Sequence, residues 1–431
     1  MFQCRSDSAP CASYICSKTN MIKFESFQLE NGLKVIVHED HSTPMAAVNL
    51  LYDVGSRDES EDKTGFAHLF EHLMFGGSKN IPQFDTPLQL VGGDNNAFTT
   101  PDITNYYINL PAVNLETAFW LESDRMLSLS FDPKVLEVQR SVVIEEFKQR
   151  YLNQPYGDLW LKLRPVVYTS HPYSWPTIGK DISHIEQATM ADVEEFFYKF
   201  YRPNNATLVV AGQVTVEQVK RLSEKWFGGI PAGPKNQRLL PVEPAQLVER
   251  RLEIEADVPL DAIYKVFRMP ERLHSDYYAI DLMNDILGKG RSSMLYNDLV
   301  KQDQVFNSIS AYASGSFDPG LIVVGGKLNE GVTLDYAESR ITEVLDNMKA
   351  GINDTAIEKT KNQAQASHAF SEIELLNRAM FLAMGDVLGD ANMINEELAK
   401  IDQVTAYDIK SVANKYLVNN SCTTMHYKAK K

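Results

Sequence analysis

The stretch from Gly65 to Gly77 reads GFAHLFEHLMFGG and holds two histidines, His68 and His72, with Glu71 directly before the second. Residues three and four apart share one face of a helix, so the two histidines can bind one ion while Glu71 lies beside it. The two final glycines are a natural helix stop. The alternative is a pair of surface histidines beside an acid, but the apolar flanks would leave such polar groups buried without partners.

The spacing H-x-x-E-H is the inverted form of a zinc peptidase motif. Catalytic zinc takes three protein ligands and a water molecule, so a third ligand has to come from another segment. A helix is expected over residues 133–151, because Asp132 is a good N-cap and Pro133 suits the first helical position.

Two glutamates of this expected helix are candidates for the third ligand. At about 100° per residue Glu146 falls on the apolar face, whereas Glu145 falls at its edge. That face consists of Val135, Val138, Val142, Val143 and Phe147. A buried Glu146 needs a counter-charge, which zinc would provide; the alternative is a pairing with an arginine or lysine.

A central segment rich in glycine and proline separates two parts of the chain that end alike. We expect a linker over residues 229–246, because this segment concentrates residues that break helices and strands. Thr189, Asp192, Lys199 and Asn204-Asn205 recur as Thr405, Asp408, Lys415 and Asn419-Asn420, with the same Asp-to-Lys spacing. These features predict two homologous domains of about 200 residues, 21–228 and 247–431. The alternative is a chance similarity between two amphipathic helix ends.

Strands and helices alternate within the first domain. Strands are expected at residues 33–37, 46–52 and 106–110, and helices at residues 65–75, 115–127, 133–151 and 190–201. The mixture predicts an α+β fold in which each domain is an antiparallel sheet flanked by helices.

The composition excludes several classes of function. The 431 residues carry 57 acidic and 42 basic side chains, for a net charge of -15, which opposes binding to nucleic acid or anionic lipid. No stretch approaches the roughly 18–20 apolar residues that span a bilayer, so no membrane partner is expected. Residues 1–20 lack the pattern of a secretory signal, and a cytoplasmic location is therefore expected.

Three of the four cysteines, Cys4, Cys11 and Cys16, lie in the first 20 residues. This distribution is not a disulfide framework. We expect residues 1–20 to be a poorly ordered extension; the alternative is a metal site formed by the three cysteines, for which no fourth ligand lies nearby.

The motifs together resemble the insulinase/pitrilysin family of zinc metallopeptidases, and in particular its short two-domain members similar to the mitochondrial processing peptidase subunits. The resemblance covers nearly all of the chain from Met21 onward. It rests on residues 65–77, 92–93, 96–106, 122–126 and 140–147. It implies that the two domains form one half of a clamshell chamber.

The resemblance also implies roles for individual residues. His68, His72 and Glu146 would bind zinc (Zn2+), and Glu71 would be the general base that accepts a proton from water. A strand would bind an extended peptide substrate by main-chain pairing at a sheet edge; the alternative is an ordinary edge strand. The residues of this strand are Asn96, Ala97, Phe98 and Thr99.

Two places depart from the family pattern. The family usually has an acid directly before the arginine matched by Arg140, where this chain has Gln139, on the same helical face as Glu146. Gln139 can still hydrogen-bond a ligand but supplies no charge. Relatives that act alone also carry an arginine and a tyrosine in the second domain, which stabilise the tetrahedral intermediate. Here the matching positions are Val300 and either Phe306 or Asn307. Losing such a donor commonly costs about 2.7–4 kcal/mol.

We therefore expect a zinc-dependent endopeptidase that hydrolyses peptides or unfolded segments inside an enclosed chamber. The expected partner is a homologous subunit without H-x-x-E-H that supplies the missing arginine and tyrosine in a heterodimer; a homodimer is the other arrangement. The alternative function is a weak or inactive structural subunit, like the respiratory-complex core proteins of this fold. The intact metal-binding motif favours the enzyme, and the missing side chains favour the alternative.

Overall fold

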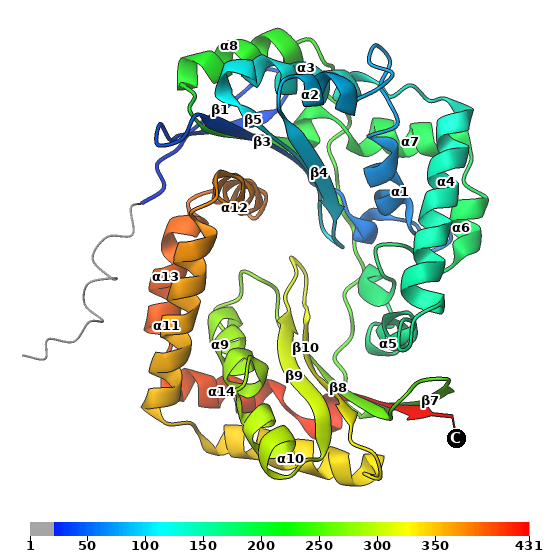
Figure 1. Ribbon diagram of the computed structural model, residues 1–431, viewed down its shortest axis with the longest axis vertical. Helices are drawn as coiled ribbons and strands as arrows, with labels where there is room; N and C mark the ends of the chain where they lie inside the picture. The colour runs from blue at the N-terminus through cyan, green and yellow to red at the C-terminus, as the bar shows by residue number, and fades with distance from the viewer. Residues whose placement is uncertain (1–20, 431) are drawn as a thin grey trace, which may run out of the picture.

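The computed structural model describes residues 21–430 as two β-sheets, each packed between helices (Figure 1). The first sheet has the order β1-β2-β6-β3-β5-β4, and the second has the order β7-β11-β8-β10-β9. The strands of the first sheet are β1 (Glu25–Gln28), β2 (Lys34–Glu39), β3 (Met45–Tyr52), β4 (Asp94–Thr99), β5 (Thr104–Pro111) and β6 (Ala206–Gly212). Those of the second are β7 (Arg250–Ala256), β8 (Ala262–Arg268), β9 (Phe306–Ser314), β10 (Leu321–Leu328) and β11 (Thr423–Ala429).

The predicted α+β class with two homologous domains is confirmed. Strands β2, β6, β3, β5 and β4 occupy the same order as β7, β11, β8, β10 and β9, so each domain repeats one sheet topology. Neighbouring strands are antiparallel except for one parallel pair in each sheet, β2–β6 and β7–β11. The expected N-terminal extension and the alternative cysteine site lie outside the described residues.

The sequence block that occurs in both domains forms the same kind of helix N-terminus in each. Helices α7 (Met190–Phe200) and α14 (Ala406–Tyr416) each begin with a capping box, formed by Thr189 with Asp192 and by Thr405 with Asp408. In such a box the hydroxyl and the carboxylate each accept a backbone N–H of the first turn. Each of these helices leads into the strand that forms the parallel pair of its sheet.

The remaining helices cover the sheets. The first domain contains α1 (Phe66–Leu73), α2 (Asp85–Leu90), α3 (Leu115–Leu127), α4 (Pro133–Phe147), α5 (Leu159–Val167), α6 (Ile182–Glu186) and α8 (Val216–Phe227). The second contains α9 (Tyr277–Gly288), α10 (Leu334–Ala350), α11 (Asp354–Ser371), α12 (Leu375–Val387) and α13 (Met393–Gln403). The helix expected over 133–151 is α4 followed by a π-helical turn at Lys148–Leu152. Residues 231–249, between the sheets, form no helix or strand.

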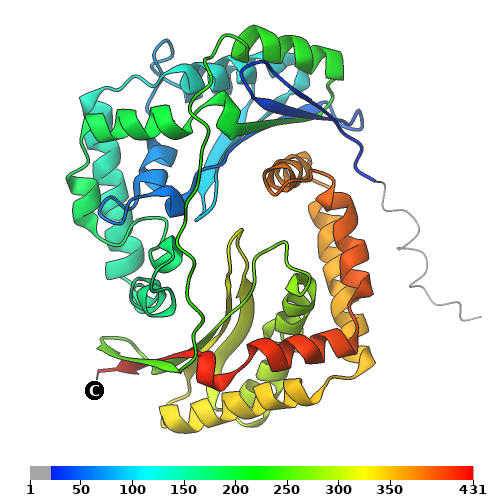
Figure 2. The same ribbon diagram turned by 180° about the vertical axis from the view of Figure 1, so that it is seen from behind.

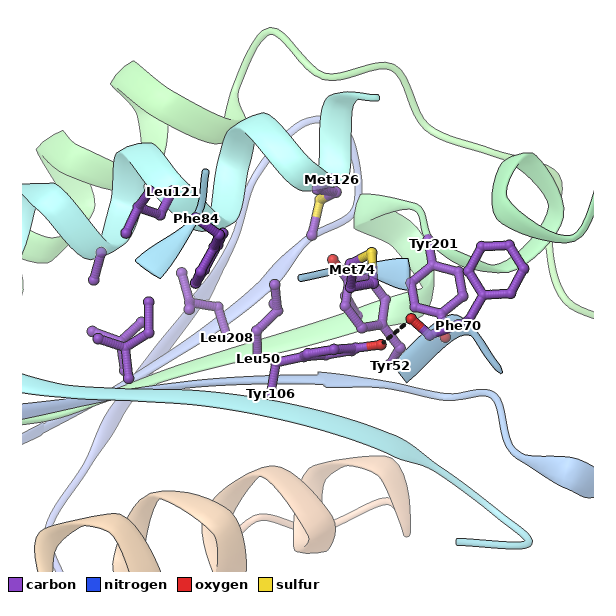
Figure 3. Close-up of a cluster of buried hydrophobic side chains, with 14 of the residues drawn as sticks. Leu50, Tyr52, Phe70, Met74, Phe84, Tyr106, Leu121, Met126, Tyr201 and Leu208 are labelled. Carbon is purple, nitrogen blue, oxygen red and sulfur yellow. Dashed lines mark hydrogen bonds between the residues drawn. The ribbon is translucent and has the colours of Figure 1, made fainter. Parts of the chain in front are cut away.

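The main core of the first domain fixes α1 against its sheet. Phe70 and Met74 pack with Tyr106 of β5 and with Tyr201, and the Tyr106 hydroxyl donates a hydrogen bond of 3.3 Å to the Phe70 carbonyl (Figure 3). Burying each such side chain contributes about 1.5–3 kcal/mol. The core therefore holds the predicted metal-binding helix in one position on the sheet.

Each sheet is covered on its other face by a helix from the opposite domain (Figures 1 and 2). Helix α12 of the second domain packs Leu382 against Leu51 and Val209 of the first sheet. Helix α5 of the first domain packs Leu163 against Val323 of the second sheet. Because separation would expose both apolar contacts to water, this reciprocal exchange joins the two domains. No helix of the described part of the chain is long and apolar enough to cross a membrane.

Candidate metal centre

Helix α1 begins at a tightly enclosed glycine and is capped by a distant acid. Gly65 has φ +90°, and a Cβ there would lie 2.6 Å from the Ile178 carbonyl oxygen, so a larger residue does not fit. The buried carboxylate of Glu59 accepts hydrogen bonds from the N–H groups of Gly65 (3.0 Å) and Ala67 (2.8 Å). Burial outweighs these donors and raises the pKa of Glu59 to about 8. Sequence analysis missed this cap, because an acid six residues before the N-cap residue Gly65 matches no local capping pattern.

His68 and His72 meet Glu146 of α4 in space. The Nε2 atoms of His68 and His72 lie 3.6 and 3.4 Å from Oε2 of Glu146, and the three ligand atoms are all within 4.8 Å of one another. Four ligands at about 2.0–2.1 Å around zinc would be about 3.4 Å apart. The donor set and its spacing therefore fit a zinc ion held by His68, His72 and Glu146.

The electrostatics of this cluster suit a cation. Burial lowers the pKa of His68 to about 4, so its imidazole is neutral at pH 7 and has a free lone pair for a metal. The Nδ1 atom of His68 is buried without a hydrogen-bond partner among the described residues. The interaction with His72 lowers the pKa of Glu146, which keeps that carboxylate charged.

The carboxylate of Glu146 lies between the two histidines and an arginine. The sequence had presented a metal ion and a basic side chain as alternative partners for Glu146. Its Oε1 atom lies 3.0 Å from Nη1 of Arg150, while Oε2 faces the two histidines. Arg150 is 68% exposed and lies one helical turn further on. The arginine thus orients the carboxylate so that one oxygen points to the metal position, in the way that outer partners orient metal ligands.

The apolar face predicted for α4 was wrong at two positions. Val138 and Val142 are 57% and 44% exposed, and the buried residues of α4 are Leu136, Val143 and Phe147. Glu146 is half-buried because α4 packs against α1. Glu145 is exposed and pairs with Lys148. Glu146 rather than Glu145 is therefore the carboxylate beside the histidines, although Val142 is not part of the buried face; its role as a ligand stays a prediction.

Glu71 lies beside the three-ligand cluster and outside it. Its Oε2 atom accepts a hydrogen bond of 2.6 Å from the Thr99 hydroxyl at the end of β4. Burial raises the pKa of Glu71, although the Thr99 hydrogen bond opposes this shift. A carboxylate with a raised pKa, next to a metal position, has the properties of a general base for water.

Strand β4, which carries Asn96, Ala97, Phe98 and Thr99, is one of the two edge strands of the first sheet; β1 is the other. It pairs with β5 on one side, from Asp94 opposite Asn109 to Thr99 opposite Thr104. An edge strand offers backbone donors and acceptors to an added strand. The position is compatible with peptide binding, which stays a prediction.

In the part of the chain that the structure describes, the positions at which the sequence departs from the family pattern form no hydrogen bond with this cluster. Gln139 is half-buried, and its side chain forms no hydrogen bond within residues 21–430. Val300 packs against the core of the second domain, Phe306 is buried in that core, and Asn307 is exposed. Val300 and Phe306 have no side-chain hydrogen-bond donor. Within the described residues, the second domain contains no group of three metal ligands.

Comparison with known proteins agrees with the fold and the motif. Residues 34–158 match the family model described as Insulinase (Peptidase family M16), and residues 187–364 match the one described as Peptidase M16 inactive domain. The chain is 30% identical to the zinc protease PqqE of Helicobacter pylori over 419 residues, which cover 94% of this chain and 93% of that protein. The chain therefore has two domains of the M16 type, and the first of them carries the H-x-x-E-H motif. The protein belongs to the insulinase family, peptidase family M16.

Two further similarities support this assignment. A crystal structure of a protease from Helicobacter pylori superposes with a TM-score of 0.88 at 29% identity, covering 94% of this chain and 99% of that one. The probable mitochondrial-processing peptidase subunit beta of Arabidopsis thaliana is 24% identical, covering 90% of this chain and 75% of that protein. The family match and the full-length similarities confirm the predicted short, two-domain form.

Proposed function

We propose that this protein is a zinc-dependent endopeptidase whose reaction takes place between α1, α4 and β4. The observation that carries the proposal is the convergence of His68, His72 and Glu146 with Glu71 placed beside them. A structural ion pair would not need a second, half-buried carboxylate held next to the histidines. The names of the relatives, zinc proteases among them, support the same reaction class.

The residues of the chain then have separate tasks. His68, His72 and Glu146 would hold the ion, which supplies a water of lowered pKa and polarises the scissile carbonyl when bound. Glu71 would accept a proton from the attacking water and deliver it to the leaving amine. Thr99 holds Oε2 of Glu71, so that the other carboxylate oxygen is available for the proton.

The substrate class follows from the edge strand. A peptide added along β4 would pair through its main chain, and this mode accepts many sequences because backbone groups make the contacts. A folded substrate cannot offer an extended strand at this edge without unfolding locally. Peptides and unfolded segments are therefore the proposed substrates.

A partner subunit completes the proposal. Neither candidate position holds the arginine or the tyrosine: Val300 and Phe306 offer no side-chain donor, and Asn307, the other candidate for the second position, has only an exposed neutral amide. A donor to a developing oxyanion commonly contributes about 2.7–4 kcal/mol. We propose that a homologous subunit without H-x-x-E-H supplies an arginine and a tyrosine in a heterodimer, with a homodimer as the other arrangement. The similarity to a protein named as a beta subunit supports this division of labour.

The direct test measures metal content and cleavage together. The purified chain is loaded with zinc and incubated with unstructured fluorogenic peptides, alone and with a homologous subunit, with and without a chelator. We expect one zinc per chain, retained in Glu71→Gln and lost in Glu146→Gln, and cleavage abolished by either change. The exposed neighbour supplies a matched control, since Glu145→Gln should retain both properties.

Two results would contradict the proposal. Zinc binding that survives Glu146→Gln would reject the ligand set. Zinc bound as expected, but with no cleavage with or without the partner, would favour the second candidate, a structural subunit. That candidate is supported by Gln139 in place of an acid, and by the missing arginine and tyrosine at Val300 and at Phe306 or Asn307.

A further inference from the structure

The hairpins β4–β5 and β9–β10, which are equivalent in the two domains, meet at their tips. The N–H of Phe317, in the β9–β10 turn, donates a hydrogen bond of 3.1 Å to Oδ2 of Asp102 in the β4–β5 turn. The next residue, Asp318, accepts a hydrogen bond of 2.7 Å from Nη1 of Arg57. Two residues of the second domain thus bind charged groups of the first.

The contact is a network of polar groups in which Arg57 and Asp102 are buried and Asp318 is 31% exposed. Nη1 of Arg57 also lies 3.0 Å from Oδ1 of Asp102, and both side chains are only 6% exposed. The Tyr173 hydroxyl donates to Asp102 and accepts the N–H of Asp318 at 3.1 Å. The Arg57 guanidinium packs over the Phe317 ring, 5.3 Å from its centre. Removing Asp318 would leave the buried guanidinium of Arg57 with fewer carboxylate partners.

The network is connected to strand β4 through the β4–β5 turn. The Thr100 hydroxyl accepts the N–H groups of Asp102 (3.1 Å) and Ile103 (3.0 Å), which closes the turn. The residue before Thr100 is Thr99, whose hydroxyl donates the hydrogen bond to Glu71. Asp102 is therefore three residues from the side chain that orients the proposed base.

A second route leads from the same network to α1. The Arg57 N–H donates a hydrogen bond of 2.9 Å to the Pro101 carbonyl. The preceding Gly55 lies so close to this turn that a Cβ would be 2.4 Å from the Pro101 oxygen. The Trp175 indole N–H is 3.1 Å from both the Ser56 carbonyl and the Glu59 carboxylate, which caps α1. The segment that binds Asp318 is thus also packed against the cap of the metal-binding helix.

We propose that Asp318 is a positioning residue: it fixes the β4–β5 turn from the second domain, and through Thr99 it fixes the carboxylate of Glu71. The inference rests on the proposed function for the role of Glu71, but the mechanical step from Asp318 to β4 can be measured without catalysis. The proposal assigns a function to the second domain, which holds no group of three metal ligands within the described residues. In this proposal the hairpin tip acts on Glu71 through Arg57 and the β4–β5 turn.

The mechanical step is tested by amide hydrogen exchange on the full chain. In Asp318→Asn the exchange of residues 99–104 should be about tenfold faster, because Arg57, which binds Asp102 and the Pro101 carbonyl of the turn, loses a carboxylate partner. Exchange in the parallel pair of strands β7 and β11, which lies away from the hairpin tip, should change less than twofold. A matched control is Asp346→Asn, since Asp346 forms an exposed ion pair with Lys349 on α10 of the same domain.

The catalytic step is tested on the active form of the enzyme, with its partner if cleavage requires one. For Asp318→Asn we expect kcat to fall about fivefold or more with KM changed less than twofold and zinc content unchanged. Asp318→Glu, which keeps the charge near Arg57, should restore at least half of kcat.

The outcomes separate this inference from the proposed function. Unchanged exchange at residues 99–104 overturns the inference whether or not the protein is a peptidase. Faster exchange with unchanged kcat overturns the positioning role. If the wild-type protein cleaves nothing under any condition, the proposed function fails, while faster exchange still supports the link between Asp318 and β4.

Discussion

Thr99 and Glu71 are joined by a hydrogen bond of 2.6 Å between two segments 28 residues apart in the sequence. The bond links the edge strand expected to bind peptide with the helix that carries the histidines. It therefore fixes the proposed base relative to the proposed substrate. This relationship gives the first prediction.

Thr99→Val keeps the shape of the side chain and removes its donor. We expect kcat for peptide cleavage to fall about tenfold or more, because a hydrogen bond to a charged group contributes about 1.5–3 kcal/mol. Zinc content should be unchanged, since Thr99 is not a ligand. Thr99→Ser retains the hydroxyl and serves as the control, and equal kcat values for the two variants would show that the bond has no catalytic role.

Glu59→Ala removes the cap of α1. The variant leaves the N–H groups of Gly65 and Ala67 buried and unpaired, so we expect the free energy of unfolding to fall by about 2–4 kcal/mol. Zinc affinity should fall as well, because His68 lies in the first turn of this helix. Urea unfolding and a zinc titration measure both effects. Glu61→Ala is the control, because Glu61 is exposed; similar losses in both variants would reject the capping role.

Arg150→Gln tests how much the orientation of Glu146 depends on its exposed partner. Exposed ion pairs contribute about 0–1 kcal/mol, so we expect zinc affinity to fall by about fivefold at most. Glu146→Gln, which removes the charged ligand itself, should weaken zinc binding at least 100-fold. A titration with a competing chelator distinguishes the two. Comparable losses in both variants would show that Arg150 holds the site together.

Leu382→Ala tests the exchange of helices between the domains. Leu382 is fully buried between α12 and the first sheet, and such a truncation costs about 2–5 kcal/mol. Urea unfolding should show this loss, and amide exchange should rise in β3 and β6, the strands that α12 covers. Phe370→Ala changes an exposed residue of the adjacent α11 and should leave both measurements unchanged. Unchanged exchange in β3 and β6 of Leu382→Ala would contradict the packing.

The contact between Asp318 and Arg57 should depend on pH in one direction. Burial alone would raise the pKa of Asp318, but contact with His171 and the charge of Arg57 lower it to about 2. Because the folded-state pKa is lowered, the stabilisation is complete above the unfolded value near 3.8 and is lost as the pH falls towards 2.

Urea unfolding of the wild type and of Asp318→Asn measures this dependence. The free energies of unfolding should differ by about 1–2 kcal/mol from pH 6 to pH 8, after allowance for the partial exposure of Asp318. The difference should shrink below about pH 4. A difference that grows as the pH falls would have the wrong sign and would contradict the assignment.

Much of the site could be predicted from the sequence because its signals are local. His68, Glu71 and His72 share one helix, and the three-to-four-residue period of a helix places them together without any knowledge of the fold. The helices over 115–127 and 190–201 follow from the same period, and α3 and α7 match them within one residue. The angular position of Glu146 predicted that it would face inward, and it lies beside the two histidines, although two valines assigned to the same face are exposed.

The amino-acid sequence by itself determined the motif, the repeated domain and the absence of donors at Val300 and Phe306. Only the tertiary structure decided that Thr99 contacts Glu71, that Glu59 caps α1, and that one helix of each domain packs against the sheet of the other domain. These contacts join residues far apart along the chain and follow no short-range period. They depend on how the sheets pack, because the burial of whole helix faces, rather than any local preference, brings such residues within hydrogen-bond distance.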